Sequence, residues 1–364
     1  MEQNKPRLFP TLIKATLLFA LFNYAFILMG DVPFGKISLY NVVFKGRERF
    51  PFGETPESYN LSLFDLDAMF ASHILAGTKK TPDEYRVLLI GDSSVWGTLL
   101  TPEQTLAGQL NTSSVSACGK NVRAYNLGYP TISLTKDLMI IDQALPYQPD
   151  LIVWLVTLEA FPRAKQLDSP IVANNAERIR DLIFKYELNA SANDPALIKL
   201  SKQDQTFLSR RRAVADLIRL QIYGALWSST GVDQIYPEDY ERAQIDLDPN
   251  DDFHGITSLS DALAMDALDA GLSTSVPTLL VNEPILISDG ANSDIRYNFY
   301  YSRWAYNEYR RTLAEYAAQH NRRYLDLWNI APMNEFTNSA IHLTPRGEKM
   351  LADKIAEAIQ SSCK

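Results

Sequence analysis

The sequence predicts an α/β protein with a three-layer α/β/α core around a mainly parallel sheet of about five strands. Short apolar runs that end at turn residues recur along the chain, and the first runs from residue 86 to 90 and ends in Gly91-Asp92-Ser93. Such runs are typical of strands that a sheet buries on both faces. Segments with helical spacing separate them, and strands that alternate with helices indicate parallel crossovers.

Size and composition exclude several classes of protein. The chain has 364 residues, of which 46% are hydrophobic, so it can bury a large core. Its net charge of -8 argues against nucleic acid as a partner. Its two cysteines, Cys118 and Cys363, are too few for a disulfide framework and can form one bridge only if the C-terminus folds back. There is no cluster of residues at metal-ligand spacing and no glycine-rich phosphate loop, so we expect neither metal nor cofactor.

Residues 8–30 are strongly apolar, with Lys14 near one end, and a membrane-spanning helix needs about 20 such residues. Lys5 and Arg7 precede this segment, so the positive-inside rule leaves the N-terminus in the cytoplasm. We therefore expect residues 1–30 to be a cytoplasmic stub and an uncleaved single-pass anchor, with the main domain extracytoplasmic. A cleaved signal peptide and a buried core helix are the alternatives.

Residues 31–80 have the composition of a juxtamembrane region. Prolines and glycines punctuate its first half, and the charged run 46–54 carries two arginines. We expect them in a solvated loop, with contact to lipid head groups as the alternative. Residues 61–76 have helical spacing, and His73 on this helix has an expected structural role.

The main domain is expected over residues 81–362, with a helical cap insertion at about 163–270. The five predicted strands cover residues 86–90, 122–127, 150–157, 276–281 and 323–328. The predicted helices cover residues 134–145, 207–227, 297–318 and 348–359. Within the insertion, the helix at 207–227 fits a cap over the active site, a helix lying on a membrane, or simply a packed helix, and we favour the packed cap. We expect a solvated acidic loop at 246–252 and assign no role to His254.

Five residues follow successive elements of the domain: Ser93, Gly128, Glu159, Glu283 and His342. Because the carboxyl ends of parallel strands open on one edge of a sheet, these residues can share a cleft. A serine needs a base to act as a nucleophile at neutral pH, and His342 is the best base available. The backbone N–H groups of Ser93 and Gly128 are the candidate donors to an oxyanion.

Three blocks carry a resemblance to a known family: Gly91-Asp92-Ser93, Asn126-Leu127-Gly128, and Ile341-His342-Leu343-Thr344-Pro345-Arg346-Gly347. They resemble the SGNH (GDSL-like) hydrolase superfamily of esterases and acyltransferases over about residues 85–160 and 275–360. The resemblance implies a flavodoxin-like sandwich, with Ser93 as nucleophile and His342 as general base. It also implies oxyanion donors at Ser93 and Gly128.

Two positions depart from the family pattern. Where the third block normally supplies an asparagine to the oxyanion hole, this chain has Glu159. Where the last block normally has an aspartate three residues before the histidine, it has Ser339, preceded by Asn338. A backbone carbonyl, Glu283 or Glu335 could orient the histidine instead. We therefore keep Glu283, Glu159, Asn338 and Ser339 as candidates for orienting His342 or contacting substrate.

The resemblance implies a membrane-anchored, extracytoplasmic serine esterase or O-acyltransferase that acts on carbohydrate or lipid esters through an acyl-enzyme. Anchored proteins of this layout are similar to partners of membrane-bound acyltransferases that modify cell-surface polysaccharides. The alternative is a catalytically degenerate scaffold that binds a polysaccharide or a membrane acyltransferase. The aromatic-rich segment 297–309 favours this alternative, although core packing is the commoner use of such side chains.

Overall fold

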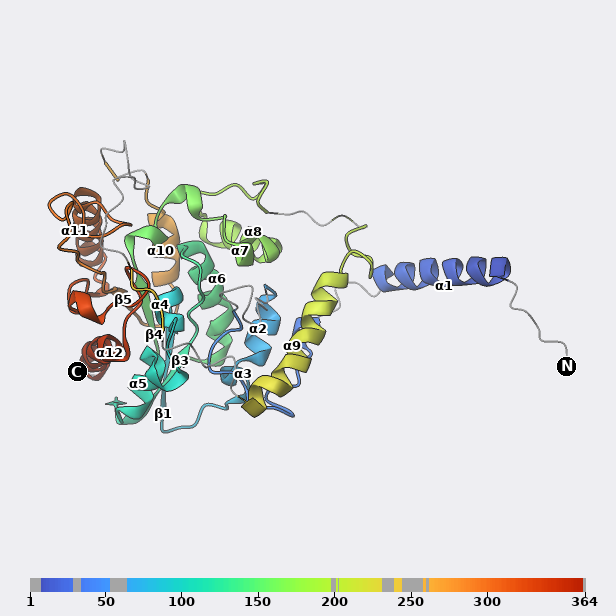
Figure 1. The fold of residues 1–364 in the computed structure, drawn as a ribbon, viewed down its shortest axis with the longest axis horizontal. Helices are drawn as coiled ribbons and strands as arrows, with labels where there is room; N and C mark the ends of the chain where they lie inside the picture. Colours follow the sequence, from blue (N-terminus) through green and yellow to red (C-terminus); the bar gives the residue numbers. More distant parts are fainter. Residues whose placement is uncertain are drawn as a thin grey trace.

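A six-stranded sheet in the order β2-β3-β1-β4-β5-β6 forms the centre of the computed structural model (Figure 1). The structure describes residues 8–28, 34–52, 64–197, 201, 203–230, 239–243, 258–259 and 262–362. The strands are β1 Glu84–Ile90, β2 Ser116–Ala117, β3 Lys120–Asn126, β4 Leu151–Val156, β5 Thr278–Asn282 and β6 Arg323–Asp326. All neighbouring pairs are parallel except β2 with β3. The α/β fold is confirmed, and the sheet gains a sixth strand because a two-residue edge strand has no readable pattern.

Helices cover both faces of the sheet. The helices of the described residues are α1 Leu8–Leu28, α2 Leu66–Ser72, α3 Ile74–Gly77, α4 Ser93–Trp96, α5 Leu106–Thr112, α6 Leu134–Ala144, α7 Pro170–Asn174, α8 Ala176–Tyr186, α9 Arg211–Thr230, α10 Met265–Leu272, α11 Arg303–Gln319 and α12 Pro345–Ser361, of which α1 and α9 lie away from the sheet. Alternate residues of a strand point to opposite faces. Val87 and Leu89 of β1 therefore belong to one buried cluster with residues of α5 and α12, and Leu88 and Ile90 belong to a second cluster that includes residues of α2, α6, α8, α10 and α11.

Helix α1 stands apart from the rest of the molecule in Figure 1. It has 21 residues, it is long and apolar enough to cross a membrane, and of its side chains only Phe26 is buried. An apolar helix with an exposed surface is unlike a core helix and consistent with a membrane anchor or a signal sequence.

Arg47 and Arg49 are buried, so the expectation of a solvated loop around them is wrong. The guanidinium of Arg49 lies 4.3 Å from the ring centroid of Trp96 and donates hydrogen bonds to the carbonyls of Gly97 (2.9 Å) and Leu100 (3.1 Å). Arginine can satisfy several carbonyls at once because its donors form a rigid planar fork. The chain before the sheet thus braces the end of α4.

His73 breaks the predicted helix 61–76 into α2 and α3. Its Nδ1 atom accepts the Leu75 N–H at 3.1 Å, so its Nε2–H faces the carbonyls of Asn126 (3.0 Å) and Glu48 (3.2 Å). Burial lowers the pKa of His73 to about 4, which keeps the ring neutral. These contacts connect three segments of the chain and occupy both ring nitrogens, as expected for a structural histidine.

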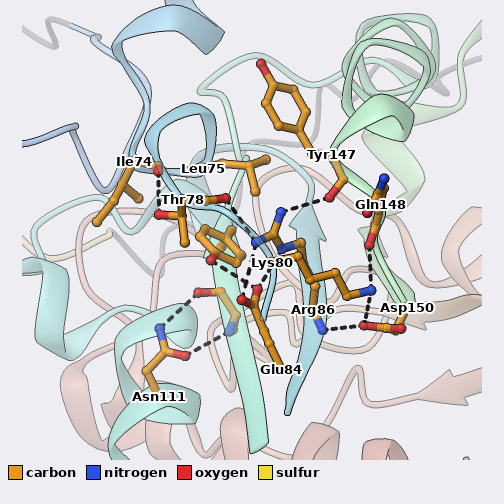
Figure 2. A network of polar contacts seen from close by, with 12 residues as sticks. Ile74, Leu75, Thr78, Lys80, Glu84, Arg86, Asn111, Tyr147, Gln148 and Asp150 are labelled. Atoms are coloured by element: carbon orange, nitrogen blue, oxygen red, sulfur yellow. Dashed lines mark hydrogen bonds and ion pairs between the residues drawn. The ribbon is translucent and has the colours of Figure 1, made fainter. Parts of the chain in front are cut away.

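Figure 2 shows the polar network at the amino end of β1, opposite the edge that carries Ser93. Arg86 is buried, pairs with Glu84 at 2.6 Å, and donates to the carbonyls of Tyr147 (2.9 Å) and Thr78 (3.1 Å). Burial alone would raise the pKa of Glu84, but the hydrogen bond and charge of Arg86 hold it below its ordinary value. The network therefore connects the start of β1 to the segments that contain Thr78 and Tyr147.

The described part of the insertion places α9 beside the chain that follows α1 rather than beside α4 and β5 (Figure 1). Gln221 on α9 accepts the Leu39 N–H at 2.7 Å, and Gly224 lies against the ring of Tyr40. The acidic stretch 246–252 and His254 lie outside the described residues.

The last helix, α12, packs against α5 and β2. Cys118, directly after β2, is disulfide-bonded, and the other cysteine of the chain, Cys363, lies just beyond the described end of α12. The C-terminal helix therefore returns to the neighbourhood of Cys118, as a single bridge requires.

Candidate active site

The turn after β1 positions Ser93 at the first residue of α4. Asp92 caps this helix, because its carboxylate accepts the Ser94 N–H at 2.8 Å. A Cβ atom on Gly91 would lie 2.5 Å from Val95 Cγ2, so only glycine fits there. Ser93 is half-buried, and its hydroxyl stands at the carboxyl edge of the sheet.

His342 reaches the same point from the other end of the domain. Its Nε2 atom lies 2.7 Å from Ser93 Oγ, although the two residues are 249 positions apart in sequence. A tight loop presents the ring: Thr337 N–H donates to the His342 carbonyl at 2.9 Å, and Phe336 bridges to Leu343. The structure therefore brings together the serine and the histidine that the sequence singles out.

The side chain that orients His342 is Asn338, whose Oδ1 atom lies 2.8 Å from Nδ1. An amide oxygen only accepts, so Nδ1 carries the proton and Nε2 is left free to accept from Ser93. Burial lowers the pKa of His342 to about 4. The ring is thus neutral at pH 7 and able to act as a base.

The two glutamates considered as orienters of His342 contact other groups. Glu283 is buried and shares a 2.5 Å hydrogen bond with the hydroxyl of Ser94. Burial, followed by the negative charge of Asp92, raises the pKa of Glu283 well above its ordinary value. Glu335 accepts a hydrogen bond from the Thr344 hydroxyl at the start of α12. Both carboxyl groups thus support turns of the site rather than the imidazole.

Glu159 follows β4 in the helical turn η4 Leu158–Ala160, and its carboxylate pairs with Lys165 at 2.5 Å. Ser339 is buried next to Tyr300. Burial raises the pKa of Tyr300, while a hydrogen bond with Ser339 opposes the rise and the charge of Glu159 adds to it. Ser339 and Glu159 therefore lie around Tyr300, which the sequence analysis did not single out.

The two candidate oxyanion donors differ in what surrounds them. Within the described part of the chain, the Ser93 N–H has no acceptor. The Gly128 N–H donates to Asn126 Oδ1 at 3.0 Å, so it is engaged in its own turn. A Cβ atom on Gly128 would lie 2.4 Å from the backbone nitrogen of Trp96, so a side chain at this position would collide with α4.

Lys136 is a second residue that the sequence analysis missed. Its fully buried ammonium donates to the carbonyls of Gly91 (2.7 Å) and Tyr129 (3.2 Å) and pairs with Asp137 at 2.6 Å. It thereby joins the turns after β1 and β3. The available signal is a Lys-Asp pair inside a helix that is otherwise largely apolar.

The described residues contain no group of three or more His, Cys, Asp and Glu side chains that could hold a metal ion. Two cavities of about 280 and 260 Å³ are lined by residues other than Ser93 and His342. The first lies around Gln166 and Asp266, and the second around Arg49 and Arg123.

No protein-family model matches the sequence, and no curated protein matches it significantly. Similar solved structures include an aryl esterase from M. smegmatis, 13% identical over 76% of this chain and 98% of that chain, with a TM-score of 0.36. Others are a carbohydrate acetylesterase from Sinorhizobium meliloti (12%, 76% and 98%, TM-score 0.35) and a G-D-S-L family lipolytic protein from Desulfitobacterium hafniense DCB-2, described as putative (12%, 75% and 98%, TM-score 0.34). Each of these similarities covers about three quarters of this chain at 12–13% identity.

Proposed function

We propose that this chain is a serine esterase or O-acyltransferase that uses Ser93 as nucleophile and His342 as general base. The observation that carries the proposal is the hydrogen-bonded series Ser93 Oγ, His342 Nε2, His342 Nδ1 and Asn338 Oδ1, with contacts of 2.7 and 2.8 Å. A nucleophile, a base and an orienting group in hydrogen-bond contact are the geometry that acyl transfer requires.

In the proposed reaction, His342 Nε2 takes the Ser93 proton while Oγ forms a bond to the carbonyl carbon of an ester. The tetrahedral oxyanion then collapses, the bond to the alcohol oxygen breaks, and the proton on Nε2 passes to that oxygen. Water or a sugar hydroxyl repeats the sequence on the acyl-enzyme, and its proton goes to His342. Hydrolysis and transfer differ only in this acceptor.

The Ser93 N–H, which has no acceptor within the described part of the chain, is the proposed donor to the oxyanion. Gly128 would have to exchange its bond with Asn126 to contribute a second donor. The negative charge of Glu159, which would repel an oxyanion, is balanced by Lys165. Removing one oxyanion donor costs enzymes about 10²–10³ in turnover. We therefore expect a slow enzyme.

We further propose that α1 anchors the protein in a membrane and that the domain lies outside the cytoplasm. The exposed apolar surface of α1 and the disulfide at Cys118 support this location, because disulfides persist in oxidising compartments. Esters of carbohydrates or lipids at the cell surface are the proposed substrates, and a membrane-bound acyltransferase is the proposed partner.

The test is covalent labelling with a fluorophosphonate, combined with turnover of a short acyl ester such as p-nitrophenyl acetate. Ser93→Ala should lose both activities. Ser94→Ala is a matched control, since Ser94 is adjacent but bound to Glu283, and it should keep the label. Equal labelling of Ser93→Ala and wild type would refute the nucleophile.

The alternative is a binding protein on this scaffold. It is favoured by the engaged Gly128 N–H and by the absence, among the described residues, of a carboxylate bonded to His342. A wild-type protein that neither labels nor turns over ester, yet binds an acylated polysaccharide, would establish it.

A further inference from the structure

Helix α9 has two unlike faces. Leu220, Gly224 and Trp227 are buried on one face. On the other, Ile218, Ile222 and Leu226 recur every four residues and are 51%, 64% and 39% exposed. A helix that faces water normally turns polar residues outward. This aliphatic stripe therefore lacks a partner within the described residues.

A second exposed apolar element lies beside the stripe. Val42 and Val43 occupy the tip of the turn between Tyr40 and Phe44 and are 81% and 66% exposed. The hydrogen bond from Leu39 N–H to Gln221 holds this turn against α9. We call Val42, Val43, Ile218, Ile222 and Leu226 the apolar strip.

Contacts with α1 indicate what the apolar strip faces. The ring of Phe207, just before α9, lies edge-on to Phe22 (5.2 Å) and Phe26 (5.5 Å), and the Leu208 N–H donates to Asn23 Oδ1 at 3.2 Å. These partners lie in the last two turns of α1. A helix of 21 residues is about 31 Å long, close to the 30 Å thickness of the hydrocarbon core. If α1 spans the membrane, α9 begins at the membrane surface.

We propose that the apolar strip is a second membrane contact, in which α9 and the Val42–Val43 turn lie in the interface of the bilayer that α1 spans. This inference rests on the proposed anchor. A lipid surface fits better than another protein because the segment that leads into α9 contacts α1, whose apolar surface is almost entirely exposed. The contact would hold the α/β domain at a fixed height and orientation above the membrane.

The test uses the full chain in liposomes of phosphatidylcholine and phosphatidylglycerol, without reductant so that the disulfide remains. An environment-sensitive fluorophore is attached to one introduced cysteine at a time. Ile222→Cys and Val42→Cys probe the apolar strip, and Phe19→Cys probes α1. Ala314→Cys is the matched control, because it is an exposed position on α11, which lies away from α1 in Figure 1. Each labelled protein must keep the wild-type melting temperature.

We expect the fluorescence of labels at 222 and 42 to be quenched by lipids spin-labelled near the head group and to be protected from quenching by aqueous iodide. The label at 314 should be quenched by iodide and not by these lipids. Iodide quenching at 222 and 42 without lipid quenching would overturn the proposal. Protection from both quenchers would also overturn it and would mean that a protein covers the strip. The label at Phe19 distinguishes failure of the proposed anchor from failure of this inference. If spin-labelled lipids do not quench the label at Phe19, the anchor is wrong. If they quench it but do not quench the labels at 222 and 42, only this inference is wrong.

Discussion

The Nδ1 atom of His342 lies 2.8 Å from the Oδ1 atom of Asn338, so the group that orients the imidazole is a neutral amide. An amide holds the tautomer as a carboxylate does, but it brings no negative charge to stabilise the imidazolium that forms when Ser93 is deprotonated. The site therefore has the geometry of a serine hydrolase with a weaker base.

Replacing Asn338 with Asp should strengthen that base. The added carboxylate raises the pKa of His342 from about 4, because an opposite charge favours the protonated ring. Since a protonated ring cannot accept the Ser93 proton, the acid limb of kcat/KM moves to higher pH. At pH 8, kcat/KM should rise about tenfold or more, because a stronger base takes the Ser93 proton more readily. The measurement is the pH profile of ester turnover, and superimposable profiles for the variant and the wild type would contradict it.

Glu348, buried in the first turn of α12, should make stability depend on pH. Burial raises its pKa from 4.5 to about 8. Between these values the unfolded chain releases a proton that the folded chain keeps, so the free energy of unfolding falls as the pH rises. Glu348→Gln should remove this loss and be more stable than wild type at pH 8, with little difference at pH 4.

Urea unfolding in detergent at pH 4, 6 and 8 measures the effect. Glu357→Gln, an exposed position on the same helix, is the control and should show no growing difference. A Glu348→Gln variant that loses stability with rising pH as steeply as wild type would exclude the prediction.

Arg86 should be far more important to stability than Arg123, its register partner on β3. Arg86→Met leaves the carboxylate of Glu84 buried without its partner, which typically costs about 3–5 kcal/mol. Arg123 is exposed, so Arg123→Met should change the free energy of unfolding by less than about 0.5 kcal/mol. Chemical denaturation compares the two, and similar losses would show that the network in Figure 2 is not the cause.

Gly128→Ala should disturb α4 without touching Ser93. The new Cβ atom would lie 2.4 Å from the Trp96 nitrogen and 2.8 Å from the Val95 carbonyl carbon, and overpacking typically costs about 1–3 kcal/mol. Because α4 carries the proposed nucleophile Ser93, fluorophosphonate labelling should slow as the melting temperature falls. Gly119→Asn is the control, since nothing lies within 4 Å of its Cβ position and asparagine tolerates its φ of 74°. An unchanged labelling rate in Gly128→Ala would refute the prediction.

The sequence predicts what depends on local pattern. The strands at 86–90 and 150–157 are visible because buried parallel strands are apolar throughout, and their ends place Ser93 and Glu159 at the carboxyl edge of the sheet. His342 is identified by its place after the last strand. None of these inferences needs knowledge of a distant contact.

What the sequence does not predict depends on distant partners. The orienter of His342 is decided by the backbone of its loop, which turns Asn338 toward the ring and Ser339 toward Tyr300. The sequence alone suggests that Arg49 is a surface charge, because its partners are backbone carbonyls that follow α4. The edge strand β2 has only two residues and offers no periodicity to read.

The contacts of Arg49 also bear on where this protein can be cut. A fragment that starts at residue 81, where the composition changes, would lose the cation that fills the carbonyl-lined hollow behind α4. A fragment that starts near residue 34 retains it. The stretch after the apolar helix is therefore more than a linker, since its arginine supports the end of the short helix on which the proposed nucleophile lies.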